Sequence, residues 1–381
     1  MEIEEKVGLY TKREILHQPS VWLKTYEIIK RDAQKISLFL DKVLDEEVDI
    51  ILTGAGSSAF IGEALRGVWL KSKGLIMRPV STTEIVTHPE HYLCSSRSTL
   101  LISFARSGNS PESIAAVEIV NKFCKKAYHI IITCNSEGKL YLKSDNGRSL
   151  KVLLPEETND VSLAMTSSFT SMMLALILIS KIDTISDERQ SVDVLSGWIS
   201  HLFSAYQDKI KEIARLDFKR AVFLGSGPLV GTARESHLKL QELTDGYVIC
   251  KFDSFLGFRH GPKAVINDET LIVYLLSDDS HAQQYEFDLI RQINGSNRGM
   301  AQVLVGRRSV DIDGFDSDLE IFYSNNENSL EIEYLCIAHV VFAQMLGYYK
   351  SIELGLNPDR PSVSGAISRV VEGVTIYEYN I

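Results

Sequence analysis

Two hydrophobic periodicities divide the chain. Residues 11–45 carry apolar side chains at helical spacing, and Thr11 and Glu14 have the spacing of a reciprocal N-terminal cap. From residue 49 onward, short β-rich runs alternate with helical stretches, and a turn rich in Gly, Ser or Asn follows each run. This alternation predicts βαβ units and a parallel sheet.

The β-rich runs form two series. The first comprises DIILTG, TLLISF, HIIITC and KVLLP, and the second comprises AVFLGSG, YVICKF, TLIVYLL, AQVLVG and LEIFYS. ILTGAGSSAFIG (51–62) and VFLGSGPLVGTA (222–233) share a strand that ends in Gly-x-Gly, small residues and a following helix. This internal repeat, with an offset of about 170 residues, predicts an α/β protein of two tandem domains, each a mostly parallel sheet flanked by helices.

The segments around the two series set the expected domain boundaries. We expect an N-terminal helical segment at 1–48, α/β domains at 49–195 and 196–350, and a C-terminal tail of little periodicity at 351–381. Between the series, KIDTISDERQSVDVLSGWISHLF indicates a polar loop and a linking helix. SLEIEYLCIAHVVFAQMLGYYKSIEL predicts a long apolar helix that closes the second domain.

Composition and charge narrow the classes of partner. The formal net charge of −10 argues against nucleic-acid binding, although amides at a helix N-terminus still bind phosphate. The five cysteines are scattered without C-x-x-C spacing, as expected of free thiols in a reducing compartment. MEIEEKVGLY shows no secretory signal, and the run MMLALILI is shorter than the roughly 20 residues of a membrane span. We therefore expect a cytoplasmic protein without membrane partners.

The first chemically informative loop follows the first strand. Gly54 and Gly56 allow a tight turn, and Ser57 and Ser58 place hydroxyls at the start of a helix. With Ala59, the glycines also match the dinucleotide pattern G-x-G-x-x-A. Three interpretations remain open for this loop alone: a dinucleotide site, a phosphate-binding serine loop and a structural turn.

A second loop of the same kind, SFARSGNSPES, favours phosphate. Arg106, Ser107 and Ser110 follow another strand, and Pro111 suits the first position of a helix. A phosphate monoester needs several converging donors, and arginine can add a bidentate pair. A dinucleotide fold does not need this second loop, and the absence of G-x-x-x-x-G-K-[ST] argues against an NTPase.

These loops and the segment PEETNDVSLAMTSSFT resemble the SIS domain, whose members bind phosphosugars through hydroxyls and backbone amides. The resemblance implies two tandem SIS domains and a phosphorylated sugar or amino sugar as substrate. It assigns phosphate binding to Ser57, Ser58, Arg106, Ser107 and Ser110, and it places Ala164, Met165, Thr166 and Ser167 along the sugar.

A third motif lies in the second domain. Glu235, Lys239 and Glu242 share one face of a predicted helix, and Glu235 and Lys239 can pair. By itself this spacing is typical of a solvated helix face with a salt bridge. With the turn His260-Gly261-Pro262 downstream, it resembles the isomerase half of glucosamine-6-phosphate synthase.

Most of the chain resembles the AgaS group, named as tagatose-6-phosphate ketose/aldose isomerase or galactosamine-6-phosphate deaminase. TKREILHQPSVWLKTYEII, SFARSGNSPES, LAMTSSFT and NPDRPSVSG carry this resemblance. It implies aldose–ketose isomerisation of galactosamine 6-phosphate, with loss of ammonia to give tagatose 6-phosphate. Glu242 is then the general base and His260 the acid–base group for ring opening, while Glu235 and Lys239 orient or modulate.

The resemblance also implies a homodimer with shared sites, because the corresponding histidine of the synthase comes from the neighbouring subunit. No metal or organic cofactor is required. Plain ketose/aldose isomerisation, a non-catalytic phosphosugar-binding module and a nucleotide-cofactor enzyme remain alternatives. The galacto configuration at C4 of the sugar is implied by the family resemblance alone.

Other candidates offer less chemistry. His88, Glu90 and His91 have metal-ligating side chains, but no further ligand cluster accompanies them, and we expect no metal site. His237 is expected to pack or to support the site. No lysine follows Lys350, so the tail lacks the imine-forming lysine that the synthase's tail carries.

Overall fold

The computed structural model describes residues 7–44, 47–143, 147–324, 329–371 and 373–379. Residues 1–6, which contribute to the expectation that there is no secretory signal, lie outside this part. Contacts group the chain into two compact units. The N-terminal-sheet unit comprises Ser20–Asp160, Ser167–Val192 and Ile367–Ile381. The C-terminal-sheet unit comprises Met1–Pro19, Val161–Thr166 and Asp193–Ala366.

The predicted helical segment is three helices: α1 (Leu9–Leu16), α2 (Gln18–Arg31) and α3 (Ala33–Leu44). The predicted cap between Thr11 and Glu14 is wrong, because α1 begins earlier, after Gly8, and has no side-chain cap. Thr11 instead binds Asp359 through its amide and hydroxyl, both at 2.8 Å. Glu14 accepts a 2.6 Å hydrogen bond from the amide of Val161. Both side chains are used for long-range contacts that local spacing cannot indicate.

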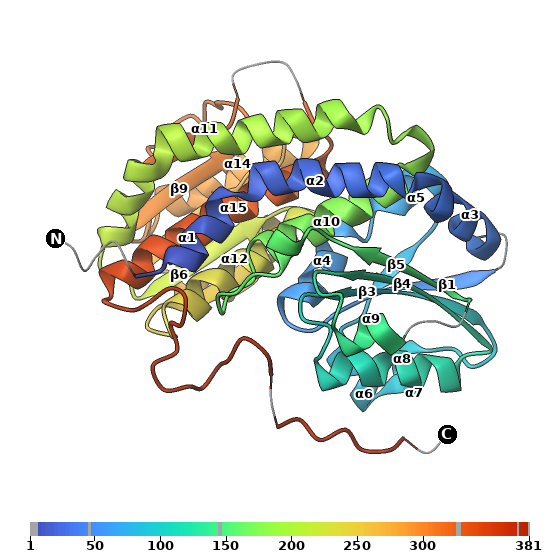
Figure 1. The fold of residues 1–381 in the computed structure, drawn as a ribbon. Helices are drawn as coiled ribbons and strands as arrows, with labels where there is room; N and C mark the ends of the chain where they lie inside the picture. Colours follow the sequence, from blue (N-terminus) through green and yellow to red (C-terminus); the bar gives the residue numbers. More distant parts are fainter. Residues whose placement is uncertain (1–6, 45–46, 144–146, 325–328, 372, 380–381) are drawn as a thin grey trace. The chain divides into compact units, whose positions relative to one another are not determined.

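The N-terminal-sheet unit contains a five-stranded sheet of order β2-β1-β3-β4-β5, with parallel pairing throughout (Figure 1). Its strands are β1 (Val48–Thr53), β2 (Met77–Pro79), β3 (Ser98–Ala105), β4 (Lys126–Thr133) and β5 (Ser149–Leu153). Its helices are α4 (Ser57–Leu65), α5 (Val68–Lys73), α6 (Thr82–Thr87), α7 (Pro89–Tyr92), α8 (Pro111–Phe123), α9 (Lys139–Lys143) and α10 (Ser167–Ser180). The predicted strands are confirmed, and the short edge strand β2 was missed.

The C-terminal-sheet unit contains a second parallel sheet, of order β10-β9-β8-β6-β7. Its strands are β6 (Arg220–Gly225), β7 (Ile249–Ser254), β8 (Thr270–Leu275), β9 (Ala301–Gly306) and β10 (Leu319–Phe322). Its helices include α12 (Leu229–Leu243), α13 (Phe255–Phe258), α14 (Ser280–Asn294) and α15 (Ile332–Glu353). The predicted linking helix is α11 (Glu188–Arg215), which carries the chain from one unit into the other.

The internal repeat is confirmed by topology and by register. Each sheet has the order second, first, third, fourth, fifth strand in its own chain sequence. Ile51 pairs with Leu101 in the first sheet, and Val222 pairs with Ile272 at the corresponding position in the second. In such open sheets, ligands bind beyond the carboxyl ends of the strands where the order reverses, which is between β1 and β3 and between β6 and β8.

Apolar side chains on both sheets are buried under helices. In the first unit, Ile51 and Leu101 pack against residues of α6 and α8, and α4 and α10 cover the other face (Figure 1). Every residue of α10 is buried, in keeping with its apolar sequence. In the second unit, α12 packs against β6 and β7 and also against α15. No helix in the described ranges is long and apolar enough to cross a membrane.

Candidate active site

The first predicted phosphate loop joins β1 to α4. Gly56 has a φ of 54°, a conformation that favours glycine. A Cβ at Gly54 would lie 2.6 Å from Ser58, so the close approach of this turn to the helix also requires glycine. Ser57 and Ser58 form the first turn of α4 and are each 5% exposed. The loop therefore has the backbone that an anion site at a helix N-terminus needs.

The second predicted loop joins β3 to α8. Because β3 pairs in parallel with β1, both loops lie at the same edge of the sheet. Ser110 precedes the helix, which begins at Pro111 as predicted, and Ser107 is half-buried. The hydroxyl of Ser107 accepts a 3.3 Å hydrogen bond from the amide of Asn109, which fixes the turn. Arg106 is only 8% exposed.

Sequence reasoning missed the residues that support this second loop. The side-chain amide of Asn135 donates to the carbonyl of Ser107 at 2.9 Å, and the amide of Leu140 donates to the carbonyl of Gly108 at 3.0 Å. A Cβ at Gly138 would lie 2.6 Å from the carbonyl oxygen of Ser107. The Asn and Gly of TCNSEG after a strand were the available signal, since such residues mark structured turns.

The segment predicted to line the sugar is mostly buried. Ala164, Thr166 and Ser167 are 0% exposed, and Met165 is half-buried. Ser167 donates to the carboxylate of Asp160 at 2.5 Å. The first three residues belong to the C-terminal-sheet unit and Ser167 to the N-terminal-sheet unit. Their contact with a sugar therefore stays a prediction.

The predicted carboxylate–lysine cluster lies on α12, and the expected pairing is confirmed. The ammonium of Lys239 is 3.3 Å from Glu235 and 2.6 Å from Glu242. Lys239 and Glu235 are 0% exposed, whereas the Glu242 side chain is 24% exposed. Burial acts to lower the pKa of Lys239, but the attraction of both carboxylates outweighs it and raises the pKa above its usual value.

This arrangement is not a solvated helix face. A charged cluster is rarely fully buried without a role that requires it, because removing charges from water is costly. Lys239 is held in its charged form between two carboxylates, and only Glu242 of the three reaches solvent. The cluster therefore presents one oriented carboxylate to solvent.

His260 lies in the turn between α13 and the short 3-10 helix Pro262–Val265. Ser254 caps α13 by accepting from the amide of Gly257 at 2.9 Å, and Gly261 has a φ of 118°. His260 is exposed, and no hydrogen bond or ion pair of its imidazole occurs within the described ranges. It is not joined to the α12 cluster by any such bond there, so its assignment stays a prediction.

His237 packs against a neighbouring aromatic ring, which is one of the two roles predicted for it. Its ring lies 4.9 Å from that of Phe252 on β7. Burial lowers its pKa to about 4, so the imidazole is neutral near pH 7. Cys134 is also unreactive, because burial raises its pKa to about 12.

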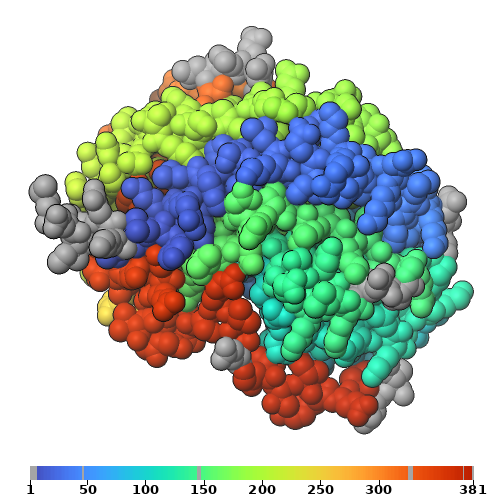
Figure 2. All heavy atoms as spheres, in the orientation of Figure 1, coloured from blue at the N-terminus to red at the C-terminus, as the bar shows by residue number. Residues whose placement is uncertain are grey.

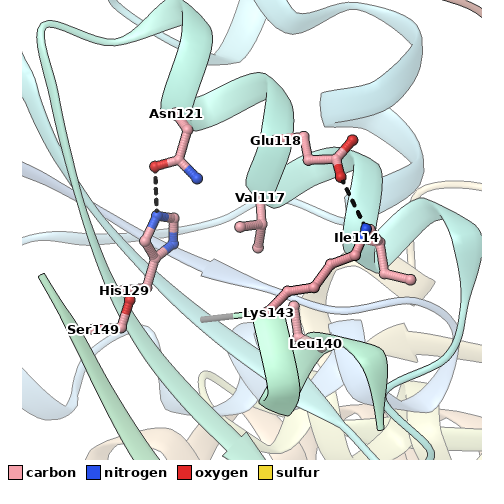
Figure 3. A pocket seen from close by; sticks show the side chains of 8 residues that line it. All are labelled: Ile114, Val117, Glu118, Asn121, His129, Leu140, Lys143 and Ser149. Atoms are coloured by element: carbon pink, nitrogen blue, oxygen red, sulfur yellow. Dashed lines mark hydrogen bonds and ion pairs between the residues drawn. The ribbon is translucent and has the colours of Figure 1, made fainter. Parts of the chain in front are cut away.

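A separate pocket of about 240 Å³ lies beside α8 (Figure 3). In it, Nε2 of His129 lies 3.1 Å from Oδ1 of Asn121, and Lys143 pairs with Glu118 at 3.5 Å. Burial lowers the pKa of His129 to about 4. None of the predicted site residues lines this pocket, and it is smaller than the roughly 300 Å³ at which ligand pockets begin. We do not place the active site there.

The second sheet repeats the turn of the first phosphate loop without its donors. Gly227 has a φ of 56°, close to that of Gly56, but Pro228 and Leu229 stand where Ser57 and Ser58 would be. Next to this turn, the carboxylate of Glu286 on α14 binds the hydroxyl of Ser226 and, at 3.1 Å, the amide of Ser277. An internal carboxylate thus binds a hydroxyl of this turn.

Glu286→Gln is expected to stabilise the protein above neutral pH. Glu286 is 0% exposed, and burial raises its pKa to about 7, against the lowering effect of its bonds to Ser226 and Ser277. The unfolded chain therefore loses this proton near pH 4.5 and the folded chain only near pH 7, so stability falls as the pH rises through that window. Removing the titration should add on the order of 2–3 kcal/mol at pH 8 and little at pH 5.

Urea unfolding at both pH values measures this difference. Glu269→Gln, an exposed change in the same unit, is the control and should alter neither value by more than about 0.5 kcal/mol. Equal effects of Glu286→Gln at pH 5 and pH 8 would contradict the expected titration.

The chain is similar to known proteins in sequence and in fold. The model of the SIS domain family matches residues 44–180. The chain is 39% identical to D-galactosamine-6-phosphate deaminase AgaS of Escherichia coli over 98% of this chain and 96% of that protein. It is 37% identical to the AgaS deaminase of Shewanella sp. (strain ANA-3), over 98% of this chain and 92% of that protein. The crystal structure of tagatose-6-phosphate ketose/aldose isomerase from Escherichia coli superposes with a TM-score of 0.89 at 36% identity, covering 98% of each chain.

Proposed function

Because the chain belongs to the AgaS family of SIS-domain proteins, we propose that it converts galactosamine 6-phosphate to tagatose 6-phosphate and ammonia. The observation that carries the proposal is the buried cluster on α12. Lys239 is fully buried between Glu235 and Glu242, and the carboxylate of Glu242 is the member that reaches solvent. Aldose–ketose isomerisation needs such an oriented carboxylate as its general base.

The reaction moves one proton between C1 and C2 of the open-chain sugar. Glu242 takes the proton from C2 and returns it to C1, and a second proton moves from the C2 amine to O1, so that the C1 aldehyde and C2 amine become a C1 hydroxyl and a C2 ketimine. Water hydrolyses the ketimine to the ketose and ammonia. Lys239 holds the Glu242 carboxylate in place through its 2.6 Å hydrogen bond, and Glu235 keeps Lys239 charged. These steps require no metal or organic cofactor.

Ring opening needs an acid–base group, and we assign it to His260. The usual pKa of an imidazole is close to neutral pH, which suits transfer in both directions. The exposure of His260 supports a homodimer in which this residue serves the partner's site. A solution mass equal to one chain of 42.7 kDa would contradict the dimer.

The two serine loops bind the phosphate in this proposal. Ser57, Ser58, Ser107 and Ser110 supply hydroxyls next to two helix N-termini, and Arg106 supplies a guanidinium. Ala164, Met165, Thr166 and Ser167 are assigned to the sugar. A cytoplasmic location also belongs to the proposal, in keeping with five free cysteines. Removal of a leader from the protein isolated from its cells would contradict that location.

Plain ketose/aldose isomerisation is the second candidate, because the similar Escherichia coli structure carries that name. Residues 351–381 contain no lysine, which bears on the choice because this segment supplies no amine for an enzyme-bound imine. A substrate that carries its own C2 amine needs no such imine. This favours the deaminase.

An ammonia-release assay tests the proposal. Purified protein is given galactosamine 6-phosphate, and ammonia and ketose are measured together; glucosamine 6-phosphate and N-acetylgalactosamine 6-phosphate define the specificity. Ammonia and ketose in equal amounts from galactosamine 6-phosphate are the expected result. Sugar conversion without ammonia would establish the plain isomerase instead. Binding without any conversion would replace the enzyme with a phosphosugar-binding module.

A further inference from the structure

The end of the chain belongs to the N-terminal-sheet unit, although the second α/β domain precedes it in sequence. Figure 2 shows dark red atoms near the end of the chain next to teal atoms of the same unit. Residues 376–379 line a hollow together with Ala115 and Ile119 of α8. The hydroxyl of Tyr379 donates to the carboxylate of Glu90 at 2.7 Å. The tail is thus packed on the helix that follows the second phosphate loop.

One tail residue contacts the phosphate loop itself. Nη2 of Arg106 donates to the backbone carbonyl of Arg369 at 2.6 Å. Arg106 is the first residue of the loop and, at 8% exposure, is almost buried. Its guanidinium is therefore fixed in part by a residue 263 positions away in the chain.

The side chain of Arg369 anchors this contact on the other side. Its Nε donates to the carbonyl of Asp160 at 2.8 Å, and its Nη2 donates to Oδ1 of Asn159 at 2.7 Å. The carboxylate of Asp160 in turn accepts from the amide of Ser168 at 2.9 Å and from the hydroxyl of Ser167 at 2.5 Å. Arg369 therefore joins the loop after β3 to the segment that begins α10.

We propose that Arg369 is a positioning residue for phosphate binding: its carbonyl holds the guanidinium of Arg106, and its own guanidinium fixes that carbonyl to Asn159 and Asp160. A long side chain that is ordered before the ligand arrives loses less freedom on binding, which increases affinity. The inference deepens the proposed function and rests on it, because it takes the loop of Arg106 as the phosphate site.

The experiment measures phosphate affinity directly, by calorimetric titration of the full chain with inorganic phosphate and by the KM for galactosamine 6-phosphate. Arg369→Ala is expected to weaken phosphate binding and raise KM by about tenfold, with kcat changed less than about threefold. Arg369→Lys keeps a donor for Asp160 and should recover part of the loss. Tyr377→Ala, an 83% exposed change in the same tail, is the matched control and should leave the phosphate affinity unchanged.

A double-mutant cycle separates positioning from a general structural effect. If Arg369 acts through Arg106, adding Arg369→Ala to Arg106→Ala should cause no further loss of phosphate affinity. Additive losses in the cycle, or wild-type phosphate affinity in folded Arg369→Ala, would overturn the proposal. If Arg369→Ala does not fold, Arg369→Gln takes its place, because glutamine cannot make both hydrogen bonds. A wild-type phosphate affinity in Arg369→Gln would then overturn the proposal.

The phosphate titration also keeps the two proposals apart. If the losses of phosphate affinity are non-additive in the double-mutant cycle but the protein releases no ammonia, the proposed reaction is rejected and the positioning role stands. If the protein releases ammonia but the losses are additive, only the positioning role is rejected.

Discussion

Glu242→Gln should lower kcat by about 10²–10⁴ and change KM little. Glutamine keeps the shape of the side chain and can still accept from Lys239, which lies 2.6 Å from the Glu242 carboxylate. It cannot take a proton from carbon, so only the transfer step is lost. The measurement is the rate of ammonia release, combined with the appearance of solvent deuterium in the sugar by NMR.

The control variant for Glu242→Gln lies on another helix of the same unit. Glu353→Gln, an exposed change at the end of α15, should leave kcat within about twofold. A circular dichroism spectrum and Tm like those of the wild type would show that Glu242→Gln is folded. If deuterium enters the sugar at the wild-type rate, Glu242 is not the base.

Lys239→Met should destabilise the protein by about 3–5 kcal/mol. Methionine has a similar length and suits an apolar interior, so the loss reports the missing charge more than a cavity. Glu235 is 0% exposed and its carboxylate would remain buried without the ammonium that lies 3.3 Å away. The free energy of unfolding in urea at pH 7 measures the effect.

Two further variants define the origin of that loss. Lys211→Met removes a half-buried lysine that pairs with the exposed Asp208 at 3.1 Å, also on a helix, and should cost less than about 1 kcal/mol. Adding Glu235→Gln to Lys239→Met removes the buried charge and should restore part of the stability. A loss below 1 kcal/mol for Lys239→Met, or no recovery in the double variant, would contradict the buried ion-pair explanation.

Local patterns were sufficient for most of the fold. Strands such as β3 and β8 are short apolar runs that end in turn residues. The similarity between the segments around Gly54 and Gly225 indicated two equivalent sheets. The edge strand β2 was missed because it has three residues and ends at Pro79, a residue that is depleted in strands. The cap at Thr11 failed because its partner is Asp359 and not a residue of its own helix.

In the candidate site, too, the sequence predicted the local features and missed those that depend on distant residues. The spacing of Glu235, Lys239 and Glu242 predicted their shared helix face, since helical periodicity fixes neighbours three and four residues apart. Their burial was not predictable, because it depends on the packing of α12 against β6, β7 and α15. Contacts such as Asn135 with Ser107, or Arg369 with Arg106, join distant segments and have no local signal in one sequence.

The long-range partners of α1 determine when this helix can dock during synthesis on the ribosome. Thr11 binds Asp359, 348 residues later, and the amide of Gly8 binds the side chain of Asn357. At about 5–20 residues per second, roughly 20–70 seconds pass between translation of the helix and translation of these partners. During that time α1 lacks the hydrogen bonds to Asn357 and Asp359. Helix α1 therefore completes its hydrogen bonding only after Asn357 and Asp359 have been made.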